Sequence, residues 1–224
     1  MQKRTLIMII CMYLCILTTA NAFDNRLIIS NVTDTKMTIS WVTENNCIGK
    51  ICLSDATQSL VKTCYDDRGE SFVGDTHYIT ISGLKRNTDY FFSIVSGEEM
   101  EDNNGQQYQV TTGNSVIPMG SFQPAGQIFL RDRTTVATHA IVYIVISNET
   151  EQSAPISTLV DQSGFWFVEL VNARQNNNEQ LFRVTSSDIL HVSVEGGVKG
   201  KYSVEYIARD NNGGKDLYPP IILE

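Results

Sequence analysis

Short strand-like runs recur along almost the entire chain, and they constrain its fold more than any other feature. Runs rich in Val, Ile, Thr, Tyr and Phe alternate with Asn, Asp and Gly clusters roughly every eight to twelve residues. No stretch sustains a helical period of apolar residues over three turns. This pattern is typical of β-sandwiches, so the sequence predicts an all-β protein of two tandem, immunoglobulin-like sandwich domains.

The first 22 residues have the form of a secretory signal peptide. Lys3 and Arg4 precede an apolar run over 5–19, and Ala20-Asn21-Ala22 is an A-x-A cleavage site. The run is too short to span a bilayer comfortably, and no later apolar run approaches 18 residues. We therefore expect export, cleavage before residue 23, and no membrane span afterwards, which places the protein outside the cell, on its surface or in a periplasm.

The first half of the mature chain contains as many strand-like runs as one immunoglobulin-like sandwich needs. In the segment 36–44, KMTISWVTE, Met37, Ile39 and Trp41 fall on one face, which makes Trp41 a core aromatic. Further along, Leu84 ends a turn and Tyr90 follows at the start of a strand, as in a tyrosine corner. The predicted strands are 26–32, 36–43, 49–54, 60–65, 76–82, 88–97 and 106–112.

These residues resemble a fibronectin type III domain over residues 23–113. One departure is Arg86, which stands where that family commonly has a proline. The resemblance implies a fold and says little about function, since the family serves mostly as spacers and binding modules. The matching positions are Trp41, Leu84, Thr88, Tyr90 and 108–113.

Residues 114–125 separate this domain from a second one, predicted over 126–224. They include Pro and Gly between patterned segments, as a linker would. Downstream, the run 161–167, DQSGFWF, places Gly164 at a turn and Trp166 on the following strand, where we expect its ring to be half-buried. This segment resembles a carboxypeptidase regulatory-like or Cna B-type domain, a prealbumin-like sandwich, and the combination resembles bacterial secreted surface proteins.

Three cysteines, Cys47, Cys52 and Cys64, remain after the leader. Their spacing matches no zinc motif, and there is no C-x-x-C pair. Export favours a disulfide. If the hairpin between 49–54 and 60–65 turns at Gln58, Cys52 lies opposite Cys64, which predicts a Cys52–Cys64 bridge and leaves Cys47 as a free or intermolecular thiol. A Cys47–Cys64 bridge is the alternative.

The sequence contains no recognisable catalytic constellation. Its three histidines, His77, His139 and His191, form no metal-binding motif, and there is no nucleophile elbow or phosphate loop. One polar segment, 65–77, could bring acids, an arginine and His77 together as a ligand or metal site, but a hydrogen-bonded loop that orders the sandwich is the preferred interpretation. Its polar members are Asp66, Asp67, Arg68, Asp75 and His77.

Other polar and aromatic features have simple interpretations. The Asn-Gly loops 99–106 and 209–216 could offer oxygens to calcium, but Asn-Gly favours tight turns, which we prefer. The sequons at Asn31 and Asn148 are read as strand-end polar residues. Three aromatic residues could form a platform for a sugar if they are exposed: Phe122, Trp166 and Tyr218.

These features predict a non-enzymatic structural or adhesion module of a bacterial cell surface or extracellular matrix, with no cofactor. The net charge of −8 disfavours nucleic acid as a partner, so we expect other extracellular proteins or like subunits, with glycans as a further partner class. The alternatives are a carbohydrate- or ligand-binding accessory protein, or a non-catalytic fragment of a larger secreted enzyme. The ligand, the oligomeric state and calcium binding stay open at this level.

Overall fold

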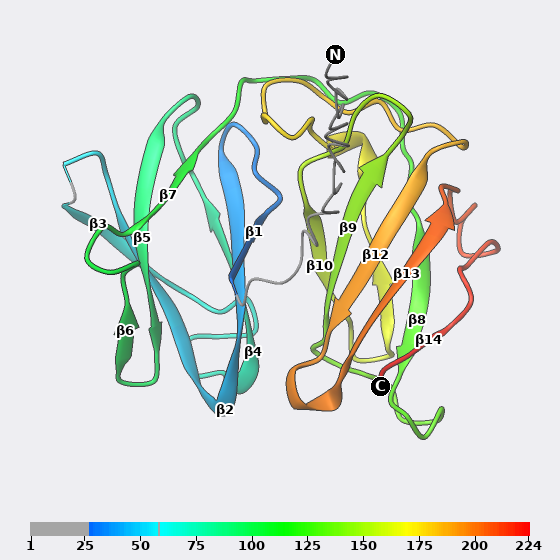
Figure 1. The fold of residues 1–224 in the computed structure, drawn as a ribbon, viewed down its shortest axis with the longest axis horizontal. Helices are drawn as coiled ribbons and strands as arrows, with labels where there is room; N and C mark the ends of the chain where they lie inside the picture. Colours follow the sequence, from blue (N-terminus) through cyan, green and yellow to red (C-terminus); the bar gives the residue numbers. More distant parts are fainter. Residues whose placement is uncertain (1–26, 58) are drawn as a thin grey trace, which may run out of the picture.

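The protein was analysed as a computed structural model that describes residues 27–57 and 59–224. The expected signal peptide over 1–22 and the expected turn centre at Gln58 lie outside these residues. The chain is all-β, and two single 3₁₀ turns are its helical elements in the described ranges (Figure 1). None of its described helices is long and apolar enough to cross a membrane.

The first sandwich contains seven strands. They are β1 (Leu27–Ser30), β2 (Lys36–Ser54), β3 (Leu60–Tyr65), β4 (Val73–Ser82), β5 (Asp89–Ser96), β6 (Glu99–Glu101) and β7 (Tyr108–Thr111). Two expected strands, 36–43 and 49–54, are one continuous strand, β2, whose register shifts between Val42 and Cys47. This irregularity bends β2, so its two halves belong to opposite sheets.

The two sheets of this sandwich share β2. The inner sheet consists of β1, the first half of β2 and β4, and the outer sheet consists of β3, the second half of β2, β5, β6 and β7. Alternation along β2 places Met37, Ile39 and Trp41 between the sheets, where they pack with Ile51 and Leu53 from its second half. The arrangement is that of an immunoglobulin-like or fibronectin-like sandwich.

A tyrosine hydroxyl closes the corner before β5. The backbone N–H of Lys85 donates to the hydroxyl of Tyr90 at 2.9 Å, and Leu84 and Tyr90 are both buried in the first core. This bond is the one that a tyrosine corner makes to the backbone a few residues upstream. It ties the connection between the two sheets to the start of β5.

The second sandwich has a four-stranded and a three-stranded sheet. The four-stranded sheet has the order β10-β9-β12-β13, and the three-stranded sheet has the order β11-β8-β14 with β14 parallel to β8. The elements are β8 (Ala125–Phe129), β9 (Ile141–Ser147), β10 (Ile156–Leu159), β11 (Phe165–Phe167), η1 (Leu170–Asn172), β12 (Ile189–Glu195), η2 (Gly197–Lys199), β13 (Lys201–Ile207) and β14 (Ile221–Ile222).

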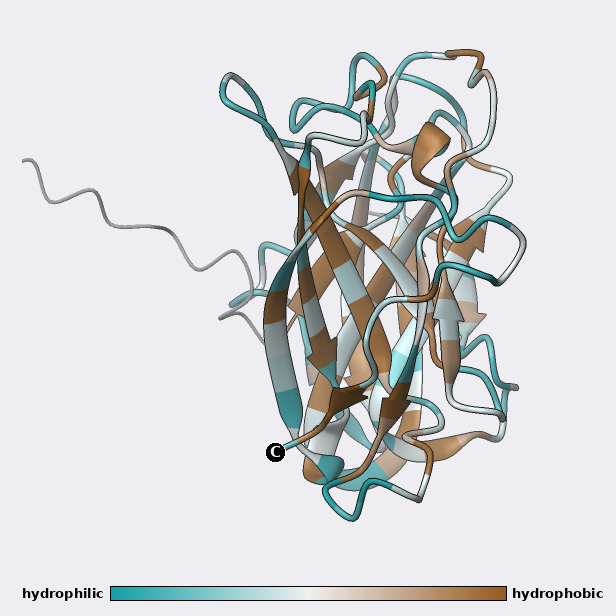
Figure 2. Cartoon of the chain, turned by 90° about the vertical axis from the view of Figure 1, so that its right-hand side faces the viewer, coloured by the Kyte–Doolittle hydropathy of each residue, from teal (hydrophilic) through white to brown (hydrophobic). Residues whose placement is uncertain are grey.

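The core of the second sandwich lies between these two sheets. Apolar stretches run along its strands, and teal, hydrophilic segments are concentrated in the connecting loops (Figure 2). Trp166 is buried in the core rather than half-buried, and its ring stacks near that of Tyr218. The turn before it uses Gly164 at φ 81°, a conformation that glycine adopts without strain, and the Asp161 carboxylate accepts the N–H groups of Ser163 and Phe165.

The two sandwiches pack side by side and are in contact with each other (Figure 1). The inner sheet of the first lies against the four-stranded sheet of the second, so four β-layers follow one another across the molecule. A small apolar cluster with members from both sandwiches lies between them. Sequence patterns predicted each sandwich, but they did not predict this contact.

Candidate functional site

Polar side chains fill much of the interface between the sandwiches, and Ser157 of β10 is at its centre. The Ser157 hydroxyl lies 2.6 Å from that of Ser30, and the Tyr78 hydroxyl donates to the Ser157 carbonyl at 3.0 Å. The Asn31 amide donates to the same carbonyl at 3.0 Å and accepts the Ser157 N–H at 3.0 Å. Asn31 belongs to one of the two sequons, and in the structure both the nitrogen and the oxygen of its side-chain amide form hydrogen bonds in the interface.

A second contact joins the middles of the two facing sheets. The hydroxyls of Ser40 and Tyr143 lie 2.8 Å apart, and burial raises the pKa of Tyr143 well above its ordinary value. Ile28, Ile141 and Leu159 pack around this pair. The interface therefore combines a satisfied polar network with an apolar cluster, which fixes the relative position of the sandwiches.

Arg68 holds a loop of each sandwich at one end of the interface. Its guanidinium donates to both carboxylate oxygens of Asp66, at 2.7 and 2.8 Å, and to the hydroxyl of Thr76 at 3.1 Å and the carbonyl of His139 at 3.4 Å. Burial by itself would raise the pKa of Asp66, but the Arg68 hydrogen bonds and the N–H of Tyr78 hold it below its ordinary value. Asp66 and Arg68 therefore form the hydrogen-bonded loop that the sequence predicts for segment 65–77.

The other members of that polar segment are dispersed. Asp67 accepts the N–H and hydroxyl of Thr80, Asp75 turns toward the second sandwich, and His77 points into the first core. Among the residues that the structure describes, no group of three or more His, Cys, Asp or Glu side chains could hold a metal ion. The segment is an interface element, and sequence alone could not show it because its partner carbonyl, His139, is 71 residues away.

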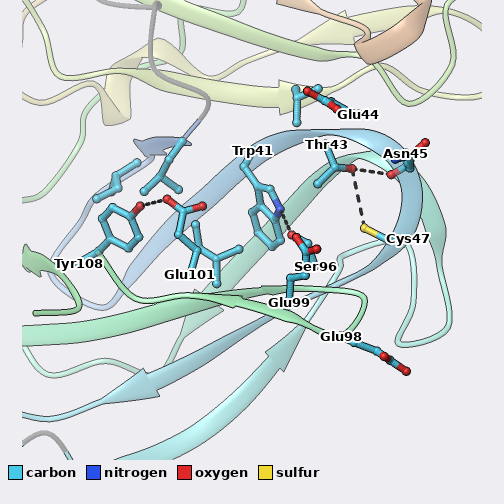
Figure 3. Close-up of a pocket in the computed structure, with 14 residues that line it drawn as sticks. Trp41, Thr43, Glu44, Asn45, Cys47, Ser96, Glu98, Glu99, Glu101 and Tyr108 are labelled. Carbon is cyan, nitrogen blue, oxygen red and sulfur yellow. Dashed lines mark hydrogen bonds between the residues drawn. The ribbon is translucent and has the colours of Figure 1, made fainter. Parts of the chain in front are cut away.

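A cleft with a volume of about 1130 Å³ lies beside the first core, between β1 and the β6–β7 side of the outer sheet. Trp41 and Tyr108 lie along it, and carboxylates stand around it (Figure 3). Trp41 is 4% exposed and donates through its indole N–H to Ser96 at 2.9 Å. Its acidic residues are Glu44, Glu98, Glu99 and Glu101.

A cysteine and a histidine meet at the wall of this cleft. The Cys47 thiol lies 3.5 Å from Nε2 of His77, and the Thr43 hydroxyl lies 3.3 Å from the same nitrogen. His77 is buried and stacks on Trp41, and desolvation lowers its pKa to about 4. Burial therefore favours the neutral form of the His77 imidazole at neutral pH.

The predicted Cys52–Cys64 opposition is wrong by one residue. The β2–β3 register places Cys52 opposite Thr63 and Cys64 opposite Ile51, and all three cysteines in the described structure are free thiols. Because side chains alternate along a strand, Cys64 points into the core while Cys52 points to the opposite face of the outer sheet. The hairpin closes with Ser54 opposite Leu60, and a register shift between Leu53 and Ser54 then brings Cys52 opposite Thr63.

The two Asn-Gly loops are hydrogen-bonded turns in the structure. The Asp102 carboxylate accepts the N–H of Gly105 at 2.9 Å, and Asp210 accepts those of Gln123 and Asn212 at 2.7 Å each. The candidate sugar platform is not available either, because Trp166 and Tyr218 are buried.

Comparisons with known proteins give a distant likeness. No protein-family model matches the sequence, and no curated protein sequence matches it. Among solved structures, the FN1–FN3 domains of chicken contactin (CNTN1) match with 12% sequence identity and a TM-score of 0.32. The match covers 75% of this chain and 58% of the contactin chain.

Proposed function

We propose that this protein is a secreted, non-enzymatic structural or adhesion module that acts through protein–protein contacts. The observation that carries the proposal is a group of exposed apolar side chains on the first sandwich, where β2 pairs with β4 and on β6. Ile48 and Val73 are directly paired there and are 41% and 57% exposed, and Met100 is 62% exposed. Large apolar side chains that are exposed next to each other, as Ile48 and Val73 are, are typical of a protein-binding surface.

The rigid stacking of the sandwiches supports the same proposal. A network of buried hydrogen bonds and an apolar cluster hold the two sandwiches together, so the exposed apolar side chains are presented on a fixed frame. The proposal includes the fibronectin type III-like and prealbumin-like character of the two sandwiches, and a bacterial surface or matrix as the place of action. The signal-like leader at residues 1–22 supports export.

Cells that export the protein offer a direct test. We expect the wild-type protein in the surface or matrix fraction, and we expect the double variant Ile48→Lys/Val73→Lys to be released into the medium. The matched control is Ile207→Lys on β13, since Ile207 is 66% exposed on the other sandwich. Retention of the double variant, or a wild-type protein found only in the cytoplasm, would contradict the proposal.

A ligand-binding accessory protein is the second candidate, and the acidic cleft favours it. Four carboxylates and the Tyr108 ring surround a volume that could admit a small cationic or polyhydroxylated ligand. Since Trp41 is almost completely buried, the cleft offers little aromatic surface for sugar stacking. A glycan array and a titration with a lysine- and arginine-rich peptide would test it, and binding abolished by Glu99→Gln would favour this candidate over the first.

A further inference from the structure

The edge of the outer sheet is formed by β3, which pairs only with β2 among the described strands. A strand with a neighbour on one side leaves alternate N–H and C=O groups without a strand partner, and such an edge can accept another strand. Leu60 and Val61 on this strand are 63% and 53% exposed. The edge is therefore both unpaired in the sheet and apolar.

Edge strands commonly carry charged side chains that prevent pairing with another strand, and β3 has few of them. Its single charged residue is Lys62, and the Lys62 ammonium donates to the carbonyl of Ser82 at 3.0 Å, across the sandwich at the end of β4. Charged side chains on an edge normally discourage pairing, but this one is directed to the protein's own backbone. β3 also contains no carboxylate, although the whole chain has a net charge of −8.

We propose that two copies of this protein associate through β3, with the two strands antiparallel and related by a two-fold axis at Thr63. This inference deepens the proposed function because it names a second copy of the chain as one partner. The outer sheets of the two copies would then form one continuous sheet. Each copy would add its own exposed apolar side chains, and the pair would double the surface that is offered to other proteins.

The sequence of β3 selects this register. An axis at Thr63 places Val61 opposite Tyr65, Lys62 opposite Cys64, and Thr63 opposite its own copy, so apolar and aromatic side chains meet and no like charges face each other. An axis at Lys62 would place two ammonium groups opposite each other, which is destabilising. If the axis lay midway between two residues, a residue that faces the core in one copy would pair with one that faces outward in the other. Directly paired residues must lie on the same face of a sheet, so this register is not possible.

Sedimentation velocity of the purified protein at increasing concentration tests the association. We expect the mass to rise from that of a monomer toward twice that value. Val61→Lys should weaken the association about tenfold or more, since it places an ammonium group opposite Tyr65 of the second copy. Ile207→Lys, on the edge strand β13 of the other sandwich, should leave it unchanged. A wild-type protein that stays monomeric, or a dimer lost in Ile207→Lys instead, would overturn the proposal.

Cysteine cross-linking tests the register. Cys52 lies opposite Thr63 in the same chain, so it is replaced by Ser to prevent a disulfide within one copy. With Thr63→Cys added, mild oxidation by diamide should give a covalent dimer, since directly opposed residues are about 5 Å apart at Cβ. With Val61→Cys instead, the two thiols would be about 13 Å apart and should not cross-link, although Val61 is the more exposed residue. Equal cross-linking at both positions would overturn the register.

The two proposals can fail separately. The dimer is measured on purified protein with changes on β3, whereas surface retention is measured in cells with changes at Ile48 and Val73. Loss of retention with an intact dimer would leave the β3 inference standing. A monomer that is still retained at the surface would overturn the β3 inference alone.

Discussion

The carboxylate of Asp75 accepts a hydrogen bond from the backbone N–H of Val198 at 2.6 Å, which joins residues 123 positions apart on different sandwiches. The neighbouring Gly197 has φ 62°, and a Cβ added there would lie 2.1 Å from the Asp75 carboxylate. The interface therefore requires glycine at this position both for its backbone conformation and for the approach of Asp75. Several expectations for variants depend on contacts of this kind.

Gly197→Ala should weaken the interface. The new methyl group forces the Asp75 side chain away from Val198, which removes a charge-assisted hydrogen bond, and the left-handed backbone adds strain, for a combined loss of about 3 kcal/mol in the free energy of unfolding. Urea denaturation measures this loss. The control is Gly213→Ala, where φ is 67° and nothing lies within 4 Å, so only the backbone cost of about 1 kcal/mol is expected. Equal losses for both variants would show that the Asp75 contact contributes nothing.

Arg68→Met should destabilise the protein by about 3 to 5 kcal/mol, because it leaves the buried Asp66 carboxylate without its partner. The exposed Arg86→Met change should cost under about 0.5 kcal/mol. In the wild type, the pKa of Asp66 is held below its unfolded value, so its stabilising effect is present above that value and is lost as pH falls through the folded pKa. Urea midpoints of the wild type and of Arg68→Met should therefore converge in acid, and a constant difference at every pH would contradict this assignment.

The free energy of unfolding should decrease in mild acid because of His77. Its pKa is lowered from 6.5 to about 4 by burial, so the unfolded chain takes up a proton before the folded one as pH falls. The contribution is complete above pH 6.5 and decreases by about 3 kcal/mol between 6.5 and 4. His77→Phe retains a ring against Trp41 but cannot be protonated, so its stability should change less across this window. An NMR titration that placed the folded His77 pKa near 6.5 would refute the expectation.

The thiols should react in an order set by the observed register. Cys52 on the outer face should be alkylated by iodoacetamide in the native protein, whereas burial raises the pKa of the Cys64 thiol and should protect it until unfolding. Mass spectrometry of tryptic peptides gives the order, and Cys52→Ser should remove the faster product. A peptide cross-linked through Cys52 and Cys64 in a non-reduced digest would contradict the register that the structure shows.

Local patterns along the chain were enough to predict the strands and several fixed points of the fold. The period of two in 36–44 placed Trp41 on the core face, because a strand exposes alternate residues to one side. The corner at Tyr90 and the turn at Gly164 also follow from nearby residues, since each is completed within a few positions. The all-β class and the sandwich architecture rest on such local signals.

The tertiary structure decided the rest. Cys52 faces Thr63 because the hairpin closes with Ser54 opposite Leu60 and then shifts its register by one residue between Leu53 and Ser54. A shift of one residue moves a side chain to the other face of the sheet. Likewise, the roles of Asn31 and Arg68 depend on atoms more than 70 residues away, at Ser157 and His139. The sequence determined which residues form strands, because that choice is local. The packing of one finished sheet against another determined which polar side chains are buried and paired, because those partners meet only in the folded chain.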